Sequence, residues 1–217
     1  MTMLSDIEAR VLGSLVEKQL TTPEYYPLTL NALTTACNQK NNRHPVTSYS
    51  EDQVAQALEG LREKNLAYVF YGSTSRVPKY KHVLPEVLHL NAAETAIVCA
   101  LMLRGSQTPG ELRSNAGRLH EFSSLEEIES TLNDLTSHDG EPLVVRLSRQ
   151  PGQKEVRFAH LLSGDVLIDV VAEMPAPRRV ASSSSDRVTK LEEELAALKE
   201  KFEDLEQQFE KFKQQFE

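Results

Sequence analysis

Basic side chains gather in three short segments of this chain that we interpret as loops or hairpins. The first segment holds Lys40, Arg43 and His44, and amide side chains stand beside them at positions 38, 39, 41 and 42. Guanidinium, ammonium and amide groups are the donors that contact phosphates and base edges. The other two segments share this character and hold Arg76, Lys79 and Lys81, and then Arg146, Arg149, Lys154 and Arg157. The three segments are therefore candidate nucleic-acid contacts, with solvated loops held by local salt bridges as the alternative.

Catalytic or metal chemistry has little support in the sequence. The six histidines are scattered and form no ligand pair at helical spacing. There is no glycine-rich phosphate loop, and no serine stands in a nucleophile-elbow motif. Cys37 and Cys99 lack metal-binding spacing, so we expect two buried thiols in a reducing compartment. We therefore expect a non-enzymatic protein without a cofactor or a metal.

The C-terminal 30 residues carry an unbroken apolar heptad. Its members alternate at spacings of three and four residues: Val188, Leu191, Leu195, Leu198, Phe202, Leu205, Phe209, Phe212 and Phe216. This spacing places one narrow apolar stripe on a helix, and a second helix must cover the stripe. We expect a homodimer or a higher oligomer, and the flanking charges allow both parallel and antiparallel pairing. A helix that docks on its own domain is the alternative.

Composition indicates a globular, cytoplasmic protein. The chain has 217 residues, of which 40% are hydrophobic and 26% charged. No apolar run approaches the ~20 residues of a membrane span, and the N-terminus lacks the features of a secretory signal. The net charge of −8 divides into zero for residues 1–90, −6 for residues 91–174 and −2 for the remainder. A protein that coats nucleic acid is normally basic, so any DNA contact must come from local clusters.

The elements that must position these residues occur in the same order twice. In residues 1–88, Ser5 caps a first helix, residues 28–38 form a second, and Ser50 with Gln53 opens a third before a hairpin of residues 66–71 and 79–84. In residues 89–174, helix starts fall at Asn91, Thr108 and Ser123 or Ser124, and a hairpin joins residues 143–147 to 155–161. Three helices followed by a hairpin is the winged-helix plan.

The predicted fold class is therefore mainly α with small β-hairpins (α+β). Two tandem winged-helix domains occupy residues 1–88 and 89–174. Pro175, Pro177 and the serines that follow mark a flexible linker at residues 175–187. A coiled-coil helix occupies residues 188–217. The polar segment at residues 104–113 is expected to form a hydrogen-bonded junction between the two domains, with a partner-binding site as the alternative.

Several long stretches of the chain are distinctive. They include Glu8-Ala-Arg-Val-Leu-Gly-Ser-Leu-Val-Glu-Lys18, Thr21-Thr-Pro-Glu-Tyr-Tyr-Pro-Leu28 and Asn38-Gln-Lys-Asn-Asn-Arg-His-Pro45, and then residues 103–113 and 153–161. On these stretches the chain resembles the bacterial YceH-like proteins over residues 4 to about 162. The resemblance implies tandem winged-helix domains and leaves the biochemical role open, because that family has no established one.

Acidic residues stand at the start of both third helices, and they argue against insertion of these helices into the major groove of DNA. Glu51 and Asp52 stand in the first copy, and Glu126, Glu127 and Glu129 stand in the second. A recognition helix enters the major groove with its N-terminal residues first. Carboxylates at those positions would repel the phosphates of the DNA. The same acids also suit the positive helix N-terminus. Two hypotheses follow: an oligomeric winged-helix regulator that binds DNA through basic loops, and an adaptor or scaffold whose winged helices bind protein partners.

Overall fold

The computed structural model describes residues 3–71, 77–138, 141–149 and 155–164. The chain divides into two units, Met1–Val170 and Val171–Glu217, and every described residue belongs to the first. The predicted linker at residues 175–187 and the predicted coiled-coil helix at residues 188–217 lie outside the described residues.

Side chains that cap helices fix where the helices begin. The six described helices of eight or more residues each follow a residue whose side chain accepts a backbone N–H of the first turn: Ser5, Thr29, Ser50, Asn91, Thr108 and Ser124. Such a cap contributes about 1 kcal/mol because it satisfies a donor that the helix leaves unpaired. The helix starts predicted at Ser5, Ser50, Asn91 and Thr108, and the alternative at Ser124, are confirmed.

The first half of the described unit combines four helices, a 3-10 turn and a three-stranded sheet. The elements are α1 Asp6–Thr21, η1 Pro23–Tyr25, β1 Leu28–Thr29, α2 Leu30–Cys37, α3 Glu51–Glu63, β2 Ala67–Phe70, β3 Lys79–His82 and α4 Leu84–Val87. The strands are antiparallel in the order β1-β3-β2. The first strand was not predicted. We expected a helix from residue 28, but the backbone of Thr29 is extended (ψ 164°) and delays the helix to Leu30.

The second half repeats this order of elements. It contains α5 Ala92–Arg104, α6 Pro109–Ala116, α7 Leu125–Thr136, β4 Val144–Arg146 and β5 Phe158–His160. The last two strands form an antiparallel pair. Gln107 forms an isolated bridge with Phe158 between α5 and α6, at the place in the order where β1 pairs with β3 in the first half. In both halves a short extended segment therefore joins the hairpin to the first two helices.

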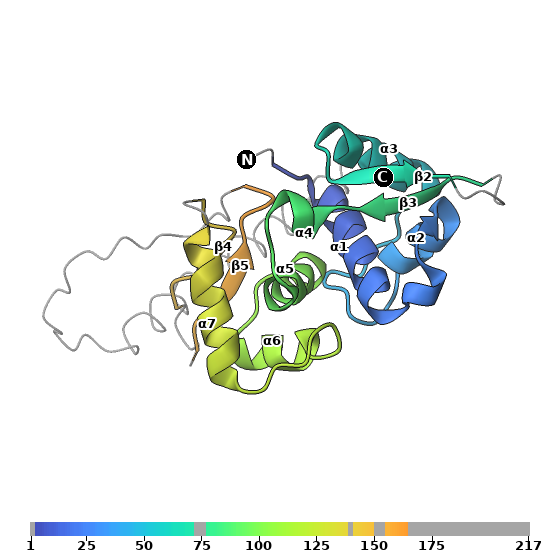
Figure 1. Ribbon diagram of the computed structural model, residues 1–217. Coiled ribbons are helices and arrows are strands. Elements are labelled where there is room, and N and C mark those ends of the chain that lie inside the picture. Colours follow the sequence, from blue (N-terminus) through green and yellow to red (C-terminus); the bar gives the residue numbers. More distant parts are fainter. Residues whose placement is uncertain (1–2, 72–76, 139–140, 150–154, 165–217) are drawn as a thin grey trace, which may run out of the picture. The chain divides into compact units, whose positions relative to one another are not determined.

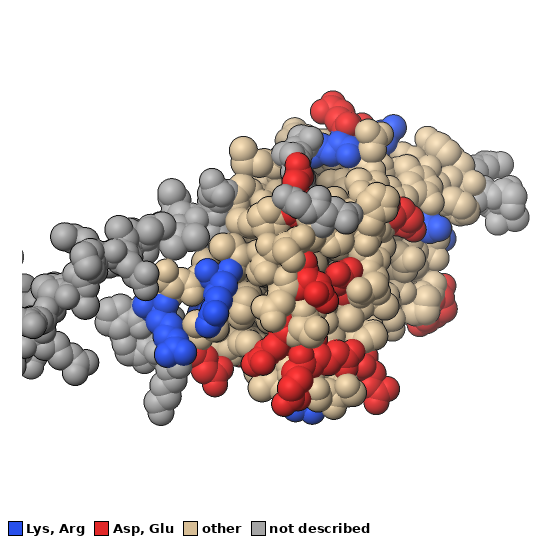
Figure 2. All heavy atoms as spheres, turned by 60° about the vertical axis from the view of Figure 1, so that its left-hand side comes forward, with Lys and Arg blue, Asp and Glu red and all other residues tan. Residues whose placement is uncertain are grey.

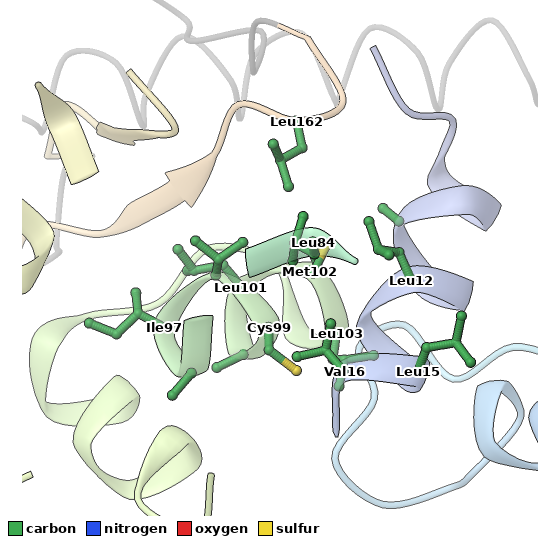
Figure 3. Packing of buried hydrophobic residues seen from close by; sticks show 14 of the residues in the cluster. Leu12, Leu15, Val16, Leu84, Ile97, Cys99, Leu101, Met102, Leu103 and Leu162 are labelled. Carbon is green, nitrogen blue, oxygen red and sulfur yellow. The ribbon is translucent and has the colours of Figure 1, made fainter. Parts of the chain in front are cut away.

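One hydrophobic core spans both halves because α1 packs against α5. In Figure 1 these two helices lie between the two sheets, and Figure 3 shows Val16 of α1 beside Leu103 of α5. The helices approach closely at Gly13, where a Cβ atom would lie 3.0 Å from Leu103 Cδ2 and 3.2 Å from Met102 Cβ. Cys99 is buried and its thiol donates to the Gly13 carbonyl at 3.4 Å. Cys37 and Cys99 are both buried, as the sequence predicted.

The last residue of β3 is a buried histidine. His82 is 5% exposed, its Nδ1 accepts from the Leu84 N–H at 3.3 Å, and its Nε2 has no partner. Tyr26 packs edge-on against the imidazole with ring centroids 6.0 Å apart. Burial, helped by the charge of Lys81, lowers the pKa of His82 to about 4. The imidazole is therefore neutral in the folded chain at pH 7.

Because His82 is buried in its neutral form, we expect the folded chain to lose stability in mild acid. In the unfolded chain its pKa returns to about 6.5, so the unfolded state binds more protons between pH 6.5 and 4 and stability falls as the pH decreases. His160, whose pKa burial also lowers to about 4, acts in the same direction. We expect a loss of about 2 kcal/mol for each histidine between about pH 7 and about pH 5, measured by urea unfolding. His82→Asn retains an acceptor for Leu84 and should remove about half of this pH dependence; an unchanged profile contradicts the assignment.

Candidate functional site

A buried carboxylate on α1 organises the polar contacts between the two halves. Glu17 is 1% exposed, and its Oε2 lies 2.6 Å from Nη2 of Arg43 in the loop between α2 and α3. Its Oε1 accepts from Arg118, which follows α6 in the second half. Burial raises the pKa of Glu17, but the hydrogen bond and charge of Arg43, with the charges of Arg118 and Lys18, outweigh it and hold the pKa below its usual value. The carboxylate is therefore ionised and bound to cations from both halves.

Arg43 corrects one of our sequence-based site assignments. We predicted a phosphate contact, but Arg43 is 5% exposed and its guanidinium binds Glu17 and the Ala36 carbonyl. The prediction was wrong because the buried carboxylate of Glu17, 26 positions away in the chain, forms an ion pair with the Arg43 guanidinium. Arg43 cannot reach a phosphate in this arrangement.

Two further contacts cross between the halves near this carboxylate. The His44 N–H donates to the Leu103 carbonyl at 2.9 Å, and Arg104 donates to Asn42 Oδ1. Other members of the polar segment at residues 104–113 bind within the second half: Gln107 donates to the Ala100 carbonyl at 3.0 Å and accepts from Asn115. The junction predicted for this segment is thus made by its first residue, Arg104.

The outer face of the first hairpin combines aromatic and basic side chains. The antiparallel register places Tyr68 opposite Lys81 and Phe70 opposite Lys79, and directly opposed residues project from the same face of a sheet. Tyr68 is 39% exposed and Phe70 is 41% exposed, and both lysines are partly exposed. Among the described residues neither ammonium forms an ion pair. We call these four residues the hairpin face.

The remaining predicted basic residues are dispersed. Lys40, His44, Arg146 and Arg149 are exposed. Arg157 instead forms a two-pronged ion pair with Glu111 of α6, with Nη2 2.8 Å from Oε2, so its charge is compensated locally. Arg76, Lys154 and the whole predicted heptad from Val188 to Phe216 lie outside the described residues.

Acidic residues occupy the exposed faces of both third helices. On α3, Glu51, Asp52 and Glu59 are exposed; on α7, Glu126 and Glu129 are exposed. Figure 2 views the side of the molecule that carries α7, and acidic side chains gather in the lower part of this side, with a few basic ones at their margin. This distribution opposes insertion of either helix between phosphate backbones.

Sequence reasoning named the lysines of the hairpin face but not its aromatic residues. Residues 66–71 are apolar or aromatic throughout, so they carry no apolar–polar alternation that would mark one side of the strand as exposed. The sequence predicts a β-forming segment there but not which of its sides faces solvent. The pairing that brings each aromatic residue to a lysine depends on the register of the hairpin, which the sequence alone does not give.

The described part of the chain offers neither a metal-ligand cluster nor a membrane-spanning helix. No group of three or more histidine, cysteine, aspartate or glutamate side chains there is placed to hold a metal ion. No helix among the same residues is both long and apolar enough to cross a bilayer.

Comparison with known proteins identifies the family. Residues 4–153 match the family described as "Protein of unknown function, DUF480". A UPF0502 protein of Opitutus terrae is 53% identical over 195 residues, which cover 90% of this chain and 83% of that protein. The UPF0502 protein YceH of Salmonella paratyphi B is 47% identical over 197 residues, 89% of this chain and 91% of its own length. The chain therefore belongs to the DUF480/UPF0502 family, which includes the YceH proteins that its sequence resembles.

Proposed function

We propose that the chain is a non-enzymatic regulator whose two halves are winged-helix modules and whose first hairpin binds DNA. The repeated order of helix, short extended segment, two helices and hairpin supports the winged-helix interpretation. The predicted coiled coil at residues 188–217 would join two copies, so that two first hairpins act together. That part of the proposal depends on the heptad alone.

The DNA proposal is carried by the hairpin face. Each of two neighbouring cross-strand pairs sets an aromatic ring beside an ammonium group. An ammonium group gains affinity by displacing condensed counterions from phosphates, and an adjacent apolar ring can pack against sugars or wedge at a base step in the minor groove. The hairpin can make such contacts while the acidic α3 helix remains outside the major groove.

A salt series on duplex DNA tests this role. Lys79→Ala together with Lys81→Ala should weaken binding about tenfold at low salt and reduce the slope of log affinity against log salt by about 2, because each lost phosphate contact removes nearly one unit. Phe70→Ala should weaken binding without changing that slope. Fluorescence anisotropy with the full chain provides the measurement.

The matched control is Arg62→Ala with Arg113→Ala, which removes the same charge from exposed positions outside the hairpin face. It should leave both affinity and slope nearly unchanged. Equal weakening by the two double variants would reduce the effect to net charge, and absence of duplex binding at low salt would reject the DNA role.

The second candidate function is a protein-binding adaptor. The exposed acidic residues of α7, Glu126 and Glu129, favour it because they offer a negative surface to a basic partner. A chain that fails to bind duplex at low salt while remaining folded would leave this candidate as the better one.

A further inference from the structure

A groove lies where the two halves meet, separate from the hairpin face. Its volume is about 560 Å³, within the roughly 300–1,000 Å³ of small-molecule sites. The start of α1, the loop before α3, the end of α5 and the second hairpin all contribute to its lining, through residues that include Arg10, His44, Met102, Leu147, His160 and Ser163. We call it the junction groove.

A buried guanidinium without a carboxylate partner lines this groove. Arg10 is 4% exposed and donates to the Pro45 carbonyl at 2.8 Å and, at 3.3 Å each, to the Cys37 carbonyl and the Thr47 hydroxyl. All three acceptors are neutral, and Nε has no partner. A charge removed from water without a counter-charge is costly. Burial and the charge of Arg43 accordingly lower the pKa of Arg10.

Arg43 provides an internal comparison. It is as deeply buried as Arg10, but Glu17 lies 2.6 Å from it and neutralises its charge. Asp6 also lines the junction groove, yet it is exposed and forms no ion pair with Arg10 among the described residues. Of these two buried arginines, Arg10 is the one that lacks an anion.

Two more polar groups of the groove lack partners. His160 Nδ1 and Ser163 Oγ are buried and unpaired, so with Arg10 Nε they make three of the six such atoms found among the described residues. Because burial lowers the pKa of His160 to about 4, its ring is neutral at pH 7 and offers one donor and one acceptor. A polar ligand in the groove could satisfy all three groups.

Apolar side chains make up part of the remaining lining, beside polar ones such as Asp6, His44 and Tyr49. Ala9, Leu101, Met102, Leu147 and Ala159 line the same groove. We infer that the junction groove binds a small organic acid, with its carboxylate on Arg10 and its apolar body against these residues. The carboxylate supplies the anion that the guanidinium lacks. Since the lining comes from both halves, the bound acid would also stabilise their packing. This inference does not depend on the DNA proposal.

Small probes test the inference directly. Benzoate and hexanoate are titrated into the full chain labelled with ¹³C at the methionine methyl groups, and the Met102 signal is followed by NMR. We expect dissociation constants of about 1 mM and a shift of the Met102 methyl signal. Benzamide and hexanamide have the same shapes without the charge, and they should bind at least about tenfold more weakly. Equal binding of amides and acids, or no Met102 shift, would overturn the inference.

Two variants separate the charge from the cavity. Arg10→Gln should weaken benzoate binding about tenfold or more. Ser106→Phe adds a ring to a different lining residue, keeps the three unpaired groups, and should abolish binding by filling the space. If Arg10→Gln fails to fold, the benzoate affinity of Ser106→Phe alone tests the site. Arg62→Gln, on the exposed side of α3, is the matched control and should bind benzoate as the parent does. Unchanged affinity in Ser106→Phe contradicts the site.

Discussion

Replacing Glu17 by alanine is expected to lower the free energy of unfolding by about 3–5 kcal/mol. The carboxylate is 1% exposed and binds Arg43, itself 5% exposed, at 2.6 Å. Removing it leaves the Arg43 guanidinium buried without a counter-charge, while Arg118, whose side chain is 42% exposed, can turn to water. Most of the loss therefore comes from stranding Arg43. Urea unfolding at neutral pH, followed by circular dichroism, measures it.

A surface ion pair of the same kind provides the control for Glu17. Glu59 and Arg62 lie 2.6 Å apart on α3 with side chains 61% and 41% exposed. Glu59→Ala should cost less than about 1 kcal/mol because solvent screens both charges. If Glu17→Ala costs no more than Glu59→Ala, the buried carboxylate does not hold the halves together as described. Glu17→Ala with Arg43→Met should recover part of the loss, since no charge is then stranded.

Replacing Gly13 by valine is expected to destabilise the chain by about 3 kcal/mol through overpacking. Even the Cβ atom would lie 3.0 Å from Leu103 Cδ2 and 3.2 Å from Met102 Cβ, and valine adds two methyl groups at the same point. Neither contact is easily relieved, because Met102 Cβ moves only with the backbone of α5 and Leu103 is 2% exposed within the core. Thermal and urea unfolding should both report the loss.

A double-mutant cycle locates the cause of this loss. Leu103→Ala alone should cost about 2–5 kcal/mol by leaving a cavity, but it also removes the atoms that meet the new side chain. The double variant Gly13→Val/Leu103→Ala should therefore lose clearly less than the sum of the single losses. Gly110→Val on α6 is the control, since a Cβ there would meet nothing nearer than Thr108 Oγ1 at 4.0 Å. Additive losses would place the strain elsewhere.

Local signals in the sequence predicted the elements well, for a physical reason. A cap acts within one turn, so Ser50 with Gln53 and Asn91 with Glu94 can be read without knowing the fold. The strand at Leu28–Thr29 was missed because its partner, β3, lies some 50 residues further along the chain and only pairing makes it a strand. A bridge such as that of Gln107 with Phe158 has the same origin.

The candidate sites were harder to predict from the sequence because they depend on contacts between residues far apart in the chain. Arg43 has the residue type and neighbours of a phosphate contact, and nothing local indicates that Glu17 removes it from the surface. Lys79 and Lys81 were identified, but their aromatic partners came with the register of the hairpin. The junction groove draws on four separate parts of the chain, and nothing local to Arg10 in the sequence indicates that its side chain lines a groove.

The packing of α1 on α5 constrains how sequences of this family can diverge. Gly13 and Cys99 touch although they stand 86 positions apart, so a bulkier residue at one point of the crossing requires a smaller one in the other copy. Although the order of elements repeats, the two halves are therefore not independent modules, and neither can be removed without exposing the core of the other. A fragment that ends after residue 88 would retain α1 with its apolar side uncovered, and such a side favours aggregation.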